Sequence, residues 1–237
     1  MIIIKTQSKE SLLLLQIMRL QNCTLTYFDL PARAEAIRLA LCVANIPFTD
    51  NRIPFSDWKT LKPTTPWGSL PILTLDDGTV IAQQRAILRF IGREAGLYPS
   101  DALAAAKVDE IMDGAEDIMG KTNVVGKDLP QNEKEEARRA ACKEGGVIHT
   151  ILSNIEGQLQ LNEGPFSVGN SLTIADFFVY TITSTLISGL YDGVPSNALD
   201  PFPKIQSLRT NVRSNPSVCK FYDNLGDSSV PSSFDKL

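Results

Sequence analysis

The first hundred residues alternate between short apolar runs and polar turns. Short alternating or continuous apolar runs predict strands, and apolar positions three and four residues apart predict helices. Between two of these runs lies Asp76-Asp77-Gly78, which predicts a β-hairpin. The predicted order is a strand at 24–28, a helix at 32–45, strands at 48–53, 72–75 and 80–82, and a helix at 84–95. We therefore expect an α/β unit with one long loop over residues 56–71.

Beyond the turn-rich stretch 96–101 the pattern is helical throughout. Thr173 followed by Asp176 matches a capping box at the start of a helix. Residues 177–191 carry no charge but include Thr and Ser, which favours a buried core helix over a membrane span. The predicted helices cover 102–127, 133 to a break at Gly145-Gly146, 147–161, 173–191, 202–213 and 216–225.

The pattern divides the chain into four segments. Residues 22–99 form the α/β domain and residues 100–230 an all-helical domain, with a tail at 231–237. Residues 1–21 are an N-terminal extension whose apolar patch, Leu12 to Leu15, is too short to cross a bilayer. The extension lacks a basic start and a small-residue cleavage site, so we expect a tail or an extra helical turn rather than a signal peptide.

Composition and charge exclude several classes of function. The chain has 237 residues, of which 43% are hydrophobic, and a formal net charge of −4 without any dense block of Lys and Arg. Binding to nucleic acid or to an anionic membrane depends on clustered positive charge and is therefore not expected. We find no Gly-rich phosphate-binding loop.

Cysteine and histidine usage narrows the chemistry further. The four cysteines are Cys23, Cys42, Cys142 and Cys219, with no CxxC pair and no spacing suited to a metal, so we expect reduced intracellular thiols. His149 is the one histidine, and we expect a structural role for it. Neither a metal site nor a cofactor is expected.

Tyr27 stands at the end of the first predicted strand, four residues of turn before the first helix. A hydroxyl in this place can donate a hydrogen bond to an anion held near the positive end of the helix. A tyrosine at a strand end can also simply pack on the core, and the residue taken alone favours that interpretation.

Four motifs, in order and with matching spacing, decide between these interpretations. They are "LTYFDLPARAEAIRLAL", "WGSLPILTLDDG", "QQRAILRFIGREAGLYP" and "VGNSLTIADF". Together, over about residues 22–225, the chain resembles the cytosolic glutathione S-transferases, and most closely their sigma class and its alpha, mu and pi relatives. The resemblance implies a thioredoxin-like N-terminal domain of order βαβ-ββα, an all-α C-terminal domain, a cytoplasmic location and a homodimer.

The resemblance also implies an activity. The thiolate of glutathione, a co-substrate, would be conjugated to hydrophobic electrophiles, and Tyr27 would stabilise that thiolate. One alternative is a glutathione-dependent isomerase or peroxidase of the prostaglandin D synthase type. Another is a non-catalytic ligand-binding or structural member, against which the joint presence of Tyr27, Trp58, Lys62, Gln83 and Pro71 argues.

The family's site residues transfer to matching positions. The implied glutathione-binding residues are Tyr27, Arg33, Trp58, Lys62, Ser69, Leu70, Pro71, Gln83, Gln84 and, from a partner subunit, Asp117. The implied second-substrate pocket contains Phe28, Arg33 and Met119. The Leu70–Pro71 peptide is expected to be cis, so that Leu70 pairs with the cysteine backbone of glutathione as an added strand would.

Several of these assignments leave alternatives open. Gln84 replaces the family's usual Ser, and Ser69 replaces a longer polar residue, so weaker glutathione affinity is expected. Lys62 and Asp117 could be solvated surface charges, and Met119 could be a core residue. The physiological electrophile does not follow from the sequence.

Overall fold

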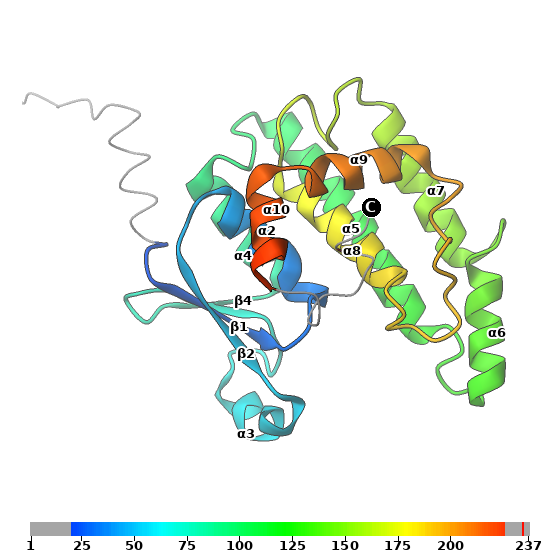
Figure 1. The fold of residues 1–237 in the computed structure, drawn as a ribbon, viewed down its shortest axis with the longest axis horizontal. Helices are drawn as coiled ribbons and strands as arrows, with labels where there is room; N and C mark the ends of the chain where they lie inside the picture. The colour runs from blue at the N-terminus through cyan, green and yellow to red at the C-terminus, as the bar shows by residue number, and fades with distance from the viewer. Residues whose placement is uncertain (1–19, 226–233, 235–237) are drawn as a thin grey trace, which may run out of the picture.

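The computed structural model describes residues 20–225 and residue 234. Its N-terminal part is built on a mixed sheet with the order β2-β1-β3-β4 (Figure 1). β1 pairs in parallel with β2, and the other two contacts are antiparallel. The strands are β1 (Cys23–Phe28), β2 (Phe48–Ile53), β3 (Ile72–Thr74) and β4 (Val80–Ala82).

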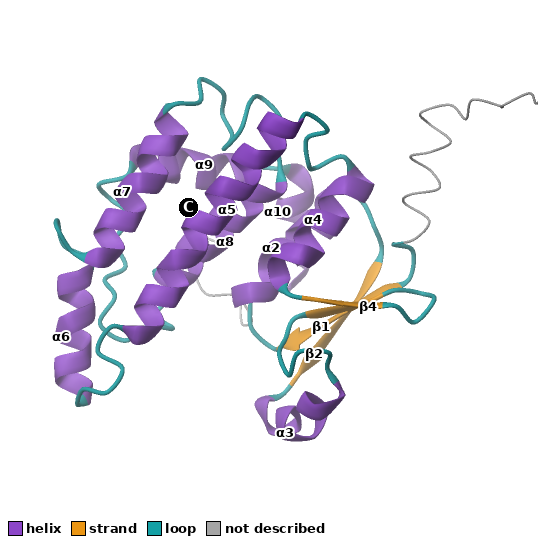
Figure 2. Ribbon diagram, turned by 180° about the vertical axis from the view of Figure 1, so that it is seen from behind, coloured by secondary structure: helices purple, strands orange, loops and turns teal. Residues whose placement is uncertain are grey.

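Two helices of the same length pack together beside this sheet. α2 (Ala32–Val43) is the crossover between the parallel strands, and α4 (Gln84–Ala95) follows β4. Short helical turns fill the loop between β2 and β3, at the edge of the molecule in Figure 2. These turns are η1 (Phe55–Asp57), α3 (Trp58–Leu61) and η2 (Lys62–Thr64).

The remaining chain is helical. α8 lies at the centre, packed against α5 and α9 of its own domain and against α2 of the sheet domain. α7 packs against α5 and α9, and α10 packs against α2. The helices are α5 (Ala102–Val124), α6 (Gln131–Ala141), α7 (Val147–Gln160), α8 (Ile174–Leu186), α9 (Pro203–Arg213) and α10 (Pro216–Leu225).

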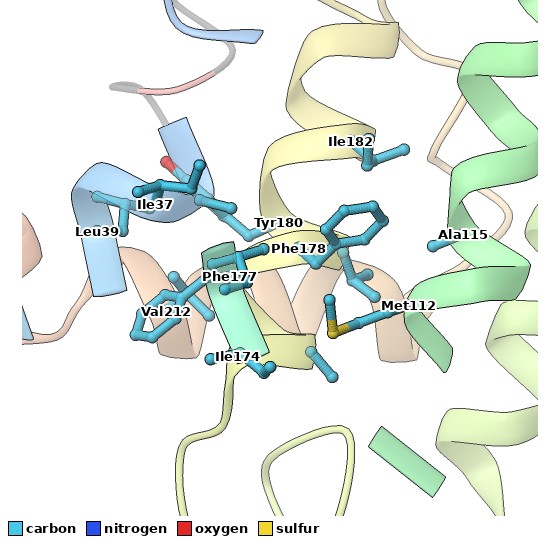
Figure 3. Packing of buried hydrophobic residues seen from close by; sticks show 14 of the residues in the cluster. Ile37, Leu39, Met112, Ala115, Ile174, Phe177, Phe178, Tyr180, Ile182 and Val212 are labelled. Atoms are coloured by element: carbon cyan, nitrogen blue, oxygen red, sulfur yellow. The ribbon is translucent and has the colours of Figure 1, made fainter. Parts of the chain in front are cut away.

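Every residue of α8 is buried. Figure 3 shows its residues Phe177 and Phe178 in a cluster to which α2 contributes Ile37 and α5 contributes Met112 and Ala115. The core therefore crosses the domain boundary, which holds the end of β1 in a fixed position relative to α5. None of the described helices is both long and apolar enough to cross a membrane.

The start of α8 confirms the predicted capping box. The Asp176 carboxylate accepts the backbone N–H groups of Ser167 and Thr173, each at 2.6 Å, and the Thr173 hydroxyl at 2.9 Å. Burial raises the pKa of Asp176, and the same backbone donors lower it. The hairpin at Asp77 is also confirmed, because that carboxylate accepts the Thr79 N–H at 2.9 Å.

Several predicted boundaries are wrong. α8 ends at Leu186, so residues 187–191 are not helical, because the Ser188 hydroxyl bonds back to the Thr185 carbonyl and Gly189 has φ +86°. α5 ends at Val124, ahead of Gly126 with its positive φ, and not at residue 127. Cys23 opens β1 rather than preceding it. Smaller shifts move the start of α6 to residue 131 and the end of α2 to residue 43.

Most of the predicted terminal segments, 1–21 and 231–237, lies outside the described residues. Phe234 is described and fully buried. Its carbonyl accepts a hydrogen bond from the Tyr180 hydroxyl, and the two rings meet edge to face at 6.1 Å.

Candidate active site

Tyr27 lies buried near the carboxyl end of β1, with 7% of its surface exposed. The turn that follows brings the first residues of α2, among them Arg33, back toward it. Burial raises the pKa of Tyr27 above its ordinary value, and the Arg33 N–H and side-chain charge lower it by less. The hydroxyl therefore stays protonated at neutral pH and can donate its own hydrogen to a second partner.

The Arg33 side chain reaches across the domain boundary. Its Nη2 lies 2.7 Å from Oε1 of Glu116 on α5, and both side chains are partly exposed. The other carboxylate oxygen, Oε2 of Glu116, is buried and has no hydrogen-bond partner among the described residues. Arg33 thus lowers the pKa of Tyr27 and is ion-paired with the helical domain, and its roles toward glutathione and the second substrate remain predictions.

The peptide bond between Leu70 and Pro71 is cis, as predicted. The antiparallel ladder between β1 and β3 ends at the pair Thr26 and Ile72. Continuing this register places Pro71 opposite Tyr27 and Leu70 opposite Phe28. Ser69 and Leu70 are partly exposed there, so their backbone lies at the same end of β1 as the tyrosine.

A cavity of about 420 Å³ lies at the N-terminus of α4. Gln83, just before the helix, has φ +74°, a conformation that costs a non-glycine residue about 1–3 kcal/mol and is found mostly at functional sites. The first N–H groups of α4 are suited to an anion. The cavity is lined by Arg33, Gln83, Gln84, Arg85, Ala86, Arg89, Asp113 and Glu116.

Gln84, which has a longer side chain than the family's usual Ser, is the first residue of α4. Its side chain is turned inward, so that only 5% of the residue is exposed. Neither its amide nitrogen nor its amide oxygen has a hydrogen-bond partner among the described residues. A buried amide of this kind is costly unless a ligand pairs with it.

Trp58 and Lys62 lie on the far side of Tyr27, in the turns between β2 and β3. Trp58 meets the ring of Phe28 edge to face at 5.6 Å, and Phe28 stacks on Phe55 at 4.4 Å. Lys62 is exposed, and its Cε lies 3.5 Å from the place where a side chain on Gly68 would begin. Lys62 therefore lies beside the segment that leads to the cis peptide bond, and Trp58 lies beside Phe28, which follows Tyr27.

The two predicted site residues of α5, Met119 and Asp117, differ in burial. Met119 is buried in the core. Asp117 is exposed and does not line the cavity at α4. It lies instead at a separate cavity of about 180 Å³ between α5 and α7. Within one chain Asp117 is thus not brought together with the other site residues, so its predicted role toward a partner subunit stays a prediction.

Two residues of this region were missed in the sequence. Glu116 is next to Asp117, and only its ion pair with Arg33 distinguishes it from a surface acid. Tyr191 is predicted in a core helix but lies in the loop after α8, and it contributes to the raised pKa of Tyr27. Three-residue spacing on α5 could have drawn attention to Glu116, since it shares a face with the buried Met119.

The described ranges were also searched for a metal site and for reactive thiols. In residues 20–225, no group of three or more His, Cys, Asp or Glu is placed to hold a metal ion. The four cysteines are unpaired, and burial raises the pKa of Cys142 to about 11 and that of Cys42, together with nearby carboxylates, to about 12. The thiols of Cys42 and Cys142 are therefore poor nucleophiles at neutral pH.

Comparison with known proteins decides the family. Residues 32–94 match the family model for the glutathione S-transferase N-terminal domain, and residues 121–224 match that for the C-terminal domain. A hematopoietic prostaglandin D synthase from Gallus gallus is 33% identical, over 83% of this chain and 93% of the relative. The chain belongs to the glutathione S-transferase family.

Other members of the family agree with this placement. Glutathione S-transferase 1 from Ascaris suum is 32% identical over the same shares of both chains. Among solved structures, rat hPGDS complexed with a quinoline superposes with a TM-score of 0.75 at 26% identity. That match covers 88% of this chain and 99% of the other. The predicted glutathione S-transferase fold is thus confirmed, with a mixed four-stranded sheet followed by a helical domain.

Proposed function

We propose that this protein is a glutathione transferase that conjugates the glutathione thiolate to hydrophobic electrophiles. The observation that carries the proposal is the buried Tyr27 side chain at the end of β1, whose raised pKa keeps the hydroxyl protonated and able to donate its hydrogen. Family membership supports glutathione as the co-substrate. The domain assignment belongs to the same proposal: residues 22–99 bind glutathione, and residues 100–230 bind the electrophile.

In the proposed mechanism Tyr27 stabilises a thiolate and does not remove a proton. A free thiol has a pKa of about 8.5, and a hydrogen bond to the sulfur favours its ionised form. Because burial raises the pKa of Tyr27, the hydroxyl remains a donor over the whole range in which the thiol ionises. The thiol loses its proton to solvent, the thiolate attacks the electrophilic carbon, the C–S bond forms, and the leaving group departs with its electron pair.

The remaining site residues would hold the peptide. Leu70, beside the cis peptide bond, would pair with the cysteine backbone of glutathione, with Ser69 next to it. Gln83, Gln84 and the first turn of α4 would bind the γ-glutamyl carboxylate. Trp58 and Lys62 would bind the glycine carboxylate. Asp117 of a partner subunit would pair with the γ-glutamyl amine.

Phe28, Arg33 and Met119 form the proposed second-substrate pocket. Met119 is buried in the core and Phe28 is stacked on Phe55, so the pocket would be bounded by apolar side chains from both domains. A homodimer, a cytoplasmic location and a role in detoxification complete the proposal.

A second function is favoured by the relatives. Proteins named hematopoietic prostaglandin D synthase, from Gallus gallus and Mus musculus, are 33% and 30% identical to this chain. A glutathione-dependent isomerisation or peroxide reduction would use the same thiolate at Tyr27. S-crystallin 3 from Enteroctopus dofleini is 30% identical, so a structural role is an outcome that the test must separate.

The test is a conjugation assay with a chromogenic aryl halide, with and without glutathione. A parallel assay measures turnover of an endoperoxide. Conjugation well above the uncatalysed rate is expected for the native protein. Tyr27→Phe should lower that rate about 10- to 150-fold, which corresponds to the 1.5–3 kcal/mol of a hydrogen bond to a charged group. Turnover of the endoperoxide alone would favour the second function, and no turnover of either would favour a structural role.

A further inference from the structure

A cavity of about 700 Å³ lies between α10 and the segment that joins α2 to β2. Figure 1 and Figure 2 both show α10 beside α2, against which it packs. None of the residues that line the cavity belongs to the candidate active site. Its walls are largely apolar, and we call it the α10 groove after the residues that form them: Cys42, Ile46, Pro47, Phe48, Phe221 and Leu225.

α10 presents two different faces. Val218 and Tyr222 are buried and pack into the core. The groove receives a second stripe, whose members are three and four residues apart along the whole helix: Ser217, Lys220, Phe221, Asn224 and Leu225. The helix has 10 residues and is therefore about 15 Å long. A stripe with this spacing forms the ridges and grooves against which another helix packs.

The chain that precedes β1 emerges beside the groove. β1 and β2 are parallel, so they begin at the same end of the sheet, and Cys23 lies opposite Phe48. Neighbouring strands are about 4.8 Å apart. Leu20 is fully buried, and Asn22, with φ +60°, lies in the turn that joins it to β1. The N-terminal extension therefore leaves the core close to the Phe48 side of the groove.

The extension contains an apolar segment, Leu12–Met18, which is interrupted by one glutamine. Ser8 and Glu10, which precede it, are typical of the start of a helix. As a helix the segment would be about 10 Å long, which is within the length of α10. Leu15 and Leu20 are five residues apart in the sequence, a separation over which an extended chain spans up to about 17 Å. The length of the connection thus allows the segment to reach the groove.

Charge favours the same occupant. Lys220 is exposed in the middle of the α10 stripe, and Glu10 is the one acidic residue of the first 19. The carboxylate at the groove, Asp50, is already ion-paired with Arg38 and Arg52. An apolar segment that begins with an acid is therefore complementary to this surface.

We propose that the segment Leu12–Met18 of the N-terminal extension binds as a helix in the α10 groove of its own chain. An apolar helix face in an apolar groove is a common mode of peptide recognition. The bound helix would cover Phe48 and Phe221 and would shield the half-buried Cys42 thiol. The inference concerns a surface outside the candidate active site and does not depend on the proposed glutathione transferase function.

The thiol of Cys42 reports whether the groove is covered. In the full-length protein, N-ethylmaleimide modification of each cysteine is followed by mass spectrometry at pH 9, where more of the thiol is ionised. A variant with Gln at all four leucines of Leu12–Leu15 should be modified at Cys42 about 10-fold or more faster than the native protein. Cys219 is an internal control, because it lies on α10 outside the groove, and its rate should change less than about twofold.

A matched control alters the apolar residues at the start of the same extension. A variant with Gln at Ile2, Ile3 and Ile4 loses similar side chains outside the proposed segment, so its Cys42 should be modified at the native rate. Thermal unfolding of both variants shows that they are folded.

Cross-linking tests the contact without removing the apolar segment. Single variants from Leu12→Cys to Leu15→Cys are oxidised with diamide, and Thr6→Cys is the control at a more distant position. At least one of the four should form a disulfide with Cys42 about 10-fold or more faster than Thr6→Cys, which exceeds the effect of the shorter connection alone.

Equal modification of Cys42 in the native protein and the leucine variant would overturn the proposal, since another segment, such as the residues after Leu225, would then cover the groove or nothing would. Protection that increases with protein concentration would overturn it in favour of a second copy. Should all cysteines of the leucine variant react faster, its fold is loosened and cross-linking decides. Equal rates from position 6 and from positions 12–15 would then reject the contact.

Discussion

At the scale of single residues, the sequence predicts a role for Tyr27 but does not indicate that Tyr191 affects the pKa of Tyr27. Tyr27, Pro71 and Gln83 occupy fixed offsets from a strand end, a cis peptide bond and a helix start, so local motifs were enough to nominate them. Glu116 and Tyr191 reach the same region only through the packing of α5 and of the loop after α8. These effects join residues far apart in sequence, so no local motif predicts them.

Gln84 allows a test at this scale. Because both of its buried amide atoms are unpaired among the described residues, a ligand at α4 is their natural partner. Gln84→Met keeps the volume and removes both polar atoms. We expect glutathione to bind about tenfold or more weakly, the loss of a hydrogen bond to a charged carboxylate, while Tm stays equal or rises.

Isothermal titration with glutathione and thermal unfolding measure the two effects. Lys59→Met, at an exposed position on α3, is a control that should change neither. Unchanged affinity in Gln84→Met would remove this side chain from the binding site, and a lower Tm would indicate an internal partner.

At the scale of elements, α8 and α9 differ in where their N-terminal caps come from. The capping box at Thr173 is local and was read correctly. The N-terminus of α9 is capped by Glu156 of α7. The Glu156 carboxylate accepts the N–H groups of Lys204 and Ile205 at 2.9 and 3.0 Å. The cap from another helix leaves no local signal, although Pro203 at the first helical position does, and the predicted start at residue 202 agrees with it within one residue. The end of α8 does have local signals, Ser188 and Gly189, which the prediction of a helix to residue 191 overlooks.

The buried capping box should contribute more to stability than an exposed cap. Asp176→Ala leaves two buried N–H groups without an acceptor, so we expect the free energy of unfolding to fall by about 2–4 kcal/mol. The matched control is Asp101→Ala at the exposed N-cap of α5, where the carboxylate accepts the Ala104 N–H at 2.9 Å and the loss should be about 1 kcal/mol. Chemical denaturation measures both, and equal losses would contradict the importance given to burial.

At the scale of the whole molecule, the division into a sheet domain and a helical domain could be read from the change in periodicity near residue 100. That α8 packs against α2 could not, because the contact joins residues far apart in sequence. Asp117 also belongs to this scale. It is exposed and does not line the α4 cavity within one chain, so its predicted role in the glutathione site requires a second copy.

Mixing two variants tests this arrangement. Tyr27→Phe and Asp117→Asn chains are each expected to be impaired as homodimers. In a mixed dimer one site carries both lesions and the other carries neither, so exchange of subunits should restore about half of the native activity to those dimers. Sedimentation establishes the oligomeric state, and a monomer, or no recovery despite proven exchange, would remove Asp117 from the site.

The central claim, that Tyr27 stabilises the glutathione thiolate, is tested most directly by titrating the thiol of bound glutathione through its ultraviolet absorbance. The account predicts a pKa at least about one unit below the free value of about 8.5 in the native protein. It predicts that Tyr27→Phe raises this pKa by about one unit or more, since each unit corresponds to about 1.4 kcal/mol of preference for the anion. The same pKa in both proteins would contradict the account.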